Sequence, residues 1–212
     1  MNFKNRQTIL VFLRAPEKGR VKTRLARDIG EEKALALYKE FVGFTLSAVK
    51  NSGMDHWICF YPEDKPGLLS NWLGKDHMYM PQTGDDLGQR MENSLARAFD
   101  QGAEKVVLVG TDIPDIRAEH FVQAFDLLSH RDVVLGPSLD GGYWLIGFQR
   151  QRFYPALFHR MNWGTDIVCK ETIQKCESAG LSLGILPALQ DIDTLADLLA
   201  FQKNNIPSPM PG

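Results

Sequence analysis

Short runs of apolar, β-branched residues recur along the chain, and most are followed by a segment with helical period. The clearest run, residues 105–109, holds four consecutive apolar residues before Gly110. Continuous apolar strands that alternate with helices are typical of a mostly parallel sheet covered by helices on both faces. The sequence therefore predicts a single α/β domain. We expect strands at residues 8–13, 57–61, 77–80, 105–109, 132–135, 143–148 and 183–186, and helices at 31–49, 67–72, 87–101, 118–129, 166–179 and 195–203.

One strand departs from the parallel pattern. Residues 143–148 follow the preceding strand after only a glycine-rich turn, which predicts an antiparallel pair and a mixed sheet. No repeat or linker divides the chain, so we expect one domain over residues 1–212. Residues 204–212 carry Pro207, Pro209 and Pro211 and are expected to form a frayed tail.

The overall composition narrows the class of protein. The 24 Lys and Arg residues nearly balance the 26 Asp and Glu residues, for a net charge of −2, which argues against a protein that coats nucleic acid. No apolar run approaches the ~18 residues of a membrane span, so we expect no membrane insertion. Three cysteines without a Cys-x-x-Cys pattern indicate neither a disulfide framework nor a zinc cage. A cytoplasmic location is expected, and the oligomeric state stays open.

A basic loop follows the first predicted strand. Residues 14–27 hold six basic residues and one acidic residue. Ligands collect at the carboxyl ends of parallel strands, and helix N-termini there favour anions. This pattern favours phosphate binding over a solvated basic turn, although the loop is not a Walker A sequence. The candidate nucleotide-binding residues of the loop are Arg14, Lys18, Gly19, Lys22 and Arg24.

Acidic residues follow three other predicted strands. Asp112, next to Thr111, comes directly after the strand 105–109 and is a candidate metal ligand, with an Asx turn as the alternative. Asp140 precedes Gly141 and Gly142, which fit either a close approach to a ligand or a tight hairpin. Asp193 precedes Thr194, and either residue could cap the last helix.

Two further segments are candidates for ligand contact. The segment with Gly84, Asp86 and Gly88 opens a helix and could present backbone donors to a nucleotide, with Asp86 as a helix cap in the alternative. Trp163 and Thr165 indicate either an acceptor-side contact or an aromatic residue before a helix cap. None of the five histidines has metal-ligand spacing, and no hydrolase motif occurs.

Taken together and in order, these segments resemble the DUF2064 family over nearly the whole chain. The resemblance is carried by Lys18 to Ala26, residues 84–91, Gly110-x-Asp112-x-Pro114, residues 136–147, Trp163-x-Thr165 and Asp191-x-Asp193-Thr194. Members of the family are described as nucleotide-diphospho-sugar transferase-like proteins. The first loop and the last motif also resemble 2-phospholactate guanylyltransferase and, more distantly, the molybdenum cofactor guanylyltransferases.

This resemblance implies a three-layer, Rossmann-like GT-A fold. It also implies a nucleotide diphosphate near the loop 18–24, and Mg²⁺ or Mn²⁺ between Asp112 and Asp193. The chain has Thr-Asp-Ile-Pro where a GT-A glycosyltransferase would carry Asp-x-Asp. That departure favours a site in which distant acids share the metal.

The leading hypothesis is a metal-dependent transferase with a nucleotide-activated donor and a small-molecule acceptor. The family description favours a glycosyltransferase that uses a nucleotide-diphospho-sugar. The loop chemistry favours a nucleotidyltransferase, of the guanylyltransferase kind, that releases pyrophosphate. The candidate catalytic residues are Asp112, Lys22 and Asp140, the last as a base near the acceptor, with Gly141, Gly142, Trp163 and Thr165 on the acceptor side. A nucleotide-binding module without turnover is the third alternative.

Overall fold

The sheet of this protein has seven strands in the order β3-β2-β1-β4-β6-β5-β7. The computed structural model describes residues 7–204. Strands β1, β2, β3 and β4 run parallel to one another and β5 runs parallel to β7, whereas β6 is antiparallel to both of its neighbours, β4 and β5. The predicted mixed, mostly parallel sheet is therefore confirmed. The strands are β1 (Gln7–Arg14), β2 (Asp55–Tyr61), β3 (Met78–Pro81), β4 (Lys105–Val109), β5 (Val133–Pro137), β6 (Tyr143–Gln149) and β7 (Leu183–Ile185).

All six predicted helices are present, with ends that differ by a few residues. A seventh helix, α1, begins within the basic loop and was not predicted. Leu25 is its only buried residue, so the sequence there shows no repeating pattern of apolar residues. The helices are α1 (Thr23–Ile29), α2 (Glu31–Ser52), α3 (Pro66–Leu73), α4 (Leu87–Asp100), α5 (Ala118–Leu127), α6 (Val168–Ser178) and α7 (Leu195–Asn204), with 3₁₀ turns η1 (Arg150–Arg152) and η2 (Pro155–Phe158).

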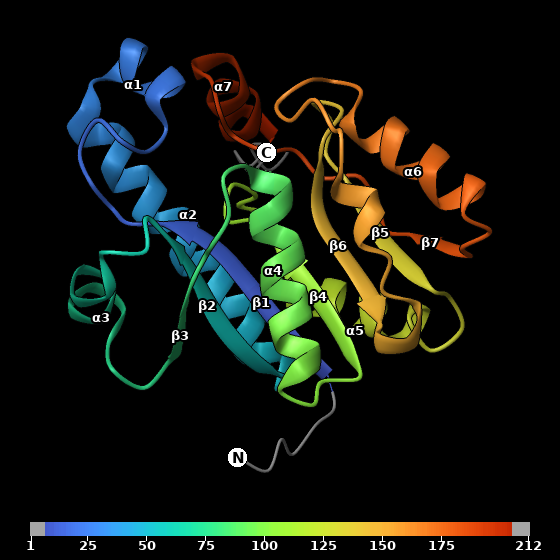
Figure 1. The fold of residues 1–212 in the computed structure, drawn as a ribbon. Helices are drawn as coiled ribbons and strands as arrows, with labels where there is room; N and C mark the ends of the chain where they lie inside the picture. The colour runs from blue at the N-terminus through green and yellow to red at the C-terminus, as the bar shows by residue number, and fades with distance from the viewer. Residues whose placement is uncertain (1–6, 205–212) are drawn as a thin grey trace, which may run out of the picture.

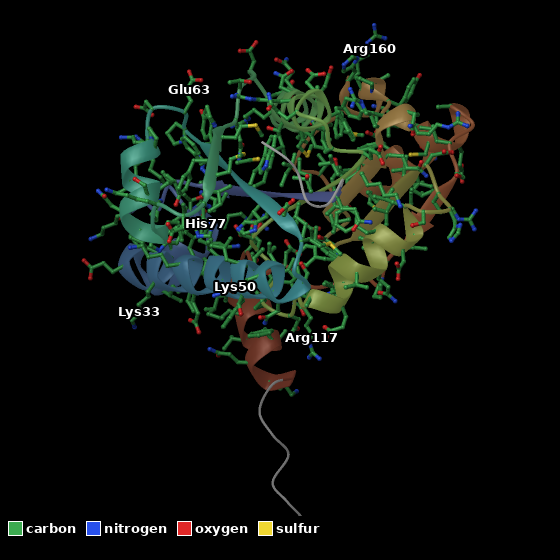
Figure 2. All side chains as sticks on the ribbon, turned by 90° about the horizontal axis from the view of Figure 1, so that it is seen from below. Lys33, Lys50, Glu63, His77, Arg117 and Arg160 are labelled. Atoms are coloured by element: carbon green, nitrogen blue, oxygen red, sulfur yellow. The ribbon has the colours of Figure 1, made fainter. Side chains whose placement is uncertain are left out.

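Helices cover both faces of the sheet, which gives the expected three layers (Figure 1). Alternate residues of β1 show the division: Ile9 and Val11 pack with α2, α3 and α5, whereas Leu10 and Phe12 pack with α4, η2 and α6. Strands with a buried core on each face are continuous apolar runs, which explains why they were readable from the sequence. Charged side chains such as Lys33, Glu63 and Arg160 point outward from the edges of the molecule (Figure 2).

A third, smaller core joins the two ends of the chain. Leu25 of α1, Phe41 of α2 and Leu198 of α7 are buried together with Ile192. This cluster holds α7 against α1, along the upper edge of the sheet in Figure 1. It thereby brings the basic loop next to residues 191–193.

No helix within residues 7–204 combines the length and the hydropathy that crossing a bilayer requires. Of the tail expected to be frayed, residues 204–212, Asn204 ends α7 and the rest lies outside the described residues.

Candidate functional site

A cavity of about 540 Å³ lies where β1, β2 and β4 end. This volume is in the range of about 300–1,000 Å³ that is usual for small-molecule sites. The carboxyl ends of parallel strands are the expected position for a ligand in an open α/β sheet. Many of the predicted site residues line the cavity, namely Arg14, Lys22, Arg24, Thr111, Asp112, Asp140, Gly142, Trp163, Thr165 and Asp193.

The other predicted residues are not part of the lining. Lys18 instead forms an exposed ion pair with Glu32, at 2.9 Å between Nζ and Oε1, and Gly19 is its neighbour. Asp86 caps α4, because its carboxylate accepts the backbone N–H of Gln89. The turn accounts for the local structure at Lys18 and Gly19, and the helix cap accounts for it at Asp86.

Three glycines near the cavity are explained by close packing. A Cβ on Gly88 would lie 2.8 Å from Nε1 of Trp163, so this glycine lets the indole approach α4. A Cβ on Gly141 would lie 2.0 Å from the carbonyl oxygen of Asp166, and one on Gly84 would lie 2.7 Å from Cβ of Gln89. Gly88 and Gly141 thus determine where the segment 163–166 sits, and this segment carries the acceptor-side candidates.

The centre of the site is an ion-pair cluster around Lys22. Its Nζ lies 2.5 Å from Oδ1 of Asp112 and 3.0 Å from Oδ1 of Asp193, and it donates to the carbonyl oxygen of Ile192 at 2.7 Å. The Lys22 side chain is 3% exposed, whereas those of Asp112 and Asp193 are 50% and 35% exposed. The ammonium is thus buried behind two carboxylates that face the cavity.

The backbone around Asp193 explains why this carboxylate is available. Thr194 caps α7, in a reciprocal arrangement in which Asp197 Oδ2 accepts the backbone N–H and the hydroxyl of Thr194. Asp193 is therefore not needed as a cap. The backbone N–H of Ile192 donates to the carbonyl oxygen of Asp112 at 3.0 Å, which ties the segment to the end of β4.

The pKa values of the charged side chains in the site reflect how many carboxylates lie close together there. Burial lowers the pKa of Lys22, but the attraction of Asp112 and Asp193 outweighs it, so that this pKa lies above its ordinary value and the lysine is charged. Burial, and then repulsion from Asp140, Asp193 and Asp112, raises the pKa of Asp191 to about 6. Asp191 was seen as part of an acidic motif but was not proposed as a site residue. The Asp-x-Asp pattern that it forms with Asp193 is the sequence signal that could have identified it as a site residue.

Several lining residues were missed as site residues. Tyr61, at the end of β2, lies between two guanidinium groups, with its ring centroid 5.2 Å from Cζ of Arg14 and 4.3 Å from Cζ of Arg90. Arg20 also lines the cavity. The signals for Arg20 and Arg90 were present, since both lie within segments that the sequence singled out. Tyr61 carries no such signal, because it ends an ordinary apolar strand.

Gln82 and Tyr38 also line the cavity and hold its walls in place. Gln82 is 6% exposed, and its Nε2 donates to the carbonyl oxygens of Cys59 and Leu13 at 2.8 and 3.3 Å. Tyr38 is buried in α2, and its hydroxyl reaches the end of β1.

The donor set at Lys22 fits a divalent cation in its chemistry. Asp112 and Asp193 converge on one cation, the Lys22 ammonium, which stands where a metal ion bound by both carboxylates would be sought. Within residues 7–204, no three His, Cys, Asp or Glu side chains form a cluster that could hold an ion. Mg²⁺ commonly uses one or two carboxylates and takes its other ligands from water and phosphate.

The fold and the cavity define a protein of the nucleotide-diphospho-sugar and nucleotidyl transferase fold class. The profile of the family described as "Uncharacterized protein conserved in bacteria (DUF2064)" matches residues 45–165. A crystal structure from Desulfovibrio desulfuricans G20, provisionally described as a nucleotide-diphospho-sugar transferase, is 40% identical, with a TM-score of 0.92 over 96% of this chain and 89% of that one. The chain belongs to the DUF2064 family.

More distant structures share the fold alone. A nucleotidyl transferase from Methanothermobacter is 15% identical, with a TM-score of 0.61 over 93% of this chain and 96% of that one. Rv0371c from Mycobacterium tuberculosis H37Rv, in complex with manganese, is 18% identical, with a TM-score of 0.56 over 94% of this chain and 98% of that one. Among curated proteins, none matches this chain.

Proposed function

We propose that this protein is a metal-dependent transferase that uses a nucleotide-activated donor, and specifically a glycosyltransferase that takes a nucleotide-diphospho-sugar. The observation that carries the proposal is the division of charge in the cavity. Arg14, Arg20 and Arg90 line it without an ion pair to any carboxylate in residues 7–204, while Asp112 and Asp193 form an acidic part that converges on the Lys22 ammonium. A diphosphate with a divalent cation is complementary to both parts.

The arginines would bind the diphosphate. A guanidinium donates two parallel N–H groups to phosphate oxygens, and such charge-assisted bonds are among the stronger ones in proteins. The positively charged guanidinium groups of Arg14 and Arg90 both lie against the ring of Tyr61. An anion between or beside them relieves their repulsion, which favours a doubly charged group at this wall. Arg24, whose Nη1 lies 3.6 Å from Asp193, joins the two parts of the cavity.

Asp112 and Asp193 would hold Mg²⁺ or Mn²⁺, which when bound supplies a positive charge for the leaving diphosphate. In the structure Lys22 holds the carboxylate groups of both residues close together. Thr111 lines the cavity beside Asp112. The same charge would stabilise the negative charge that develops as the donor bond breaks. Catalysis would therefore rest chiefly on positioning and on preorganised electrostatics.

Asp140, Gly142, Trp163 and Thr165 would form the acceptor side. Asp140 Oδ1 accepts the backbone N–H of Gly142 at 2.9 Å, so the turn fixes this carboxylate. A carboxylate fixed at the cavity wall can accept the proton of an acceptor hydroxyl as the new bond forms. Trp163 packs edge-on against Tyr143, with ring centroids 6.4 Å apart, and offers a flat apolar surface beside it.

Nucleotidyl transfer is the second candidate, since the arginine-rich loop would equally bind the phosphates of a nucleoside triphosphate. The two reactions release different products. A glycosyltransferase breaks the bond between sugar C1 and oxygen and releases a nucleoside diphosphate. In nucleotidyl transfer the acceptor attacks the α-phosphorus of the triphosphate, the bond to the oxygen that bridges to the β-phosphate breaks, and pyrophosphate is released.

The test offers a panel of nucleotide-diphospho-sugars and of nucleoside triphosphates with pooled small-molecule acceptors and Mn²⁺. We expect release of a nucleoside diphosphate that is lost in Asp112→Asn. Pyrophosphate release from a triphosphate would replace the first proposal by the second. Thermal stabilisation by nucleotides without any product over the panel would instead indicate a binding module, and no response to any nucleotide would contradict all three.

A further inference from the structure

The Lys22 ammonium has no hydrogen-bonding capacity left for a ligand. A lysine ammonium has three donors, and Lys22 directs them at Asp112, Asp193 and the carbonyl oxygen of Ile192. The side chain is also nearly sealed from solvent. In this arrangement the Lys22 ammonium is not available to bind a phosphate, although it lies in the loop that the sequence assigns to phosphate binding.

The carboxylates of Asp112 and Asp193 are likewise already paired with Lys22. Asp112 and Asp193 each place an Oδ1 atom on the same ammonium, so Lys22 already occupies the point on which the two carboxylates converge. A divalent ion that used both would lie within a few ångströms of a lysine charge, in a position where burial weakens solvent screening. The arrangement therefore holds either cation well, but not both at once.

We propose that Lys22 is the resting cation of the site, and that Mg²⁺ or Mn²⁺ takes Asp112 and Asp193 only when the Lys22 ammonium leaves them for an incoming diphosphate. This inference rests on the proposed function for the identity of the anion. The diphosphate supplies new acceptors for Lys22, and the metal supplies a new charge for the carboxylates. Metal and diphosphate consequently depend on each other for binding.

The chain has the means for such an exchange. The lysine side chain is a flexible four-carbon stem, and Lys22 lies directly before α1 with φ 46°, so it is not held within the helix. Arg24 contacts the other oxygen of Asp193, at 3.6 Å, and its side chain is 65% exposed. Arg27 is the matched comparison, because it is an exposed cation of α1 that lies outside the cavity lining and forms no ion pair with either carboxylate.

The first experiment measures Mn²⁺ binding alone, by the loss of the free-ion signal in electron paramagnetic resonance. We expect weak binding by the wild type and binding at least about fivefold tighter by Lys22→Met, the lower end of typical coupling between sites. Arg27→Met should stay close to the wild type. Equal Mn²⁺ affinity of Lys22→Met and the wild type, with both variants folded by circular dichroism, would overturn the proposal.

The second experiment needs no variant that could fail to fold. The ¹⁵N signal of the Lys22 ammonium is followed in the wild type, with Lys22→Arg used only to assign it. We expect little change with Mg²⁺ or pyrophosphate alone and a large shift when both are present, after correction for the complex they form in solution. An unchanged signal while both are bound would overturn the exchange. Neither readout requires turnover, so failure here is distinguishable from failure to transfer a sugar or a nucleotide.

Discussion

The hydroxyl of Tyr38 bonds both backbone groups of Arg14. It donates to the Arg14 carbonyl oxygen at 2.7 Å and accepts the Arg14 N–H at 2.8 Å. The pairing of β1 with β4 ends at Val11 and Val109, three residues before Arg14. Tyr38 therefore replaces the missing strand partner on the β4 side of Arg14, while the pairing with Tyr61 of β2 holds the other side.

The substitution Tyr38→Phe should consequently destabilise the protein. It leaves a backbone donor and an acceptor without a partner in a buried position, at a cost of roughly 1–3 kcal/mol in the free energy of unfolding. Urea denaturation measures this difference. Tyr79→Phe is the control, since the Tyr79 hydroxyl bonds the carbonyl oxygen of Gly74 at 2.6 Å at an exposed site. An equal loss in the two variants would contradict the role assigned to Tyr38.

Arg90→Met should weaken the binding of pyrophosphate, measured by calorimetry without metal. Charge-assisted bonds to a phosphate are worth roughly 1.5–3 kcal/mol, so the expected loss is about tenfold or more. Arg27→Met makes the same change of charge at an exposed position of α1 outside the cavity lining, and should bind nearly as the wild type does. A similar loss in both variants would show that only net charge matters.

Gln82→Glu should destabilise the protein in a pH-dependent way. The new carboxyl would be buried and would face the carbonyl oxygens of Cys59 and Leu13, so its pKa in the folded state should rise above the ordinary value of about 4.3. Stability should then be lost as pH rises through that folded-state pKa, and be recovered in acid. Chemical denaturation at several pH values measures this effect.

The control for Gln82→Glu is Gln149→Glu. The Gln149 side chain donates to the Arg131 carbonyl oxygen at an exposed position, where water solvates a carboxylate. Its effect should be within about 0.5 kcal/mol at neutral pH. A Gln82→Glu variant as stable as the wild type above pH 7 would contradict the packing described for Gln82.

His56 should make stability fall in mild acid. Burial, followed by repulsion from His77, lowers the pKa of His56, and His56 Nε2 lies 3.1 Å from His77 Nδ1. The unfolded chain then binds a proton more readily than the folded protein, so stability is lost as pH falls below about 6.5, the ordinary value. His56→Gln should show a shallower decline than the wild type or His130→Gln, measured by thermal unfolding between pH 7.5 and pH 5. Parallel declines in all three would contradict this assignment.

The fold could be predicted from the sequence because the inner strands of the sheet have a core on both faces. Ile9 and Leu10 point to opposite layers and are both fully buried, so the run to which they belong is apolar throughout. Helix α1 was missed for the opposite reason. Leu25 is its only buried residue, in a small core on which Ile29 also packs, and the rest of this short helix is polar or partly exposed.

The site was only partly predictable. Asp112 follows a strand that the sequence pattern predicts, and Lys22 lies in the basic loop, so the sequence singled out both residues, which line one cavity in the structure. Their mutual contact was not predicted, because ion pairing depends on side-chain direction and not on spacing. Gln82 and Tyr61 have no chemical signature in the sequence. Their roles come from the ends of β1, β2 and β3 meeting at one edge, and only the three-dimensional arrangement reveals that.

The contact between Lys22 and Asp193 spans 171 residues, and the family profile over residues 45–165 includes neither of them. Closing so long a loop is entropically costly, and contacts between distant residues form slowly. The core of the sheet can assemble from residues closer in sequence. A refolding protein should therefore regain its far-ultraviolet circular dichroism before its affinity for ligands, which makes ligand affinity a late marker of complete folding.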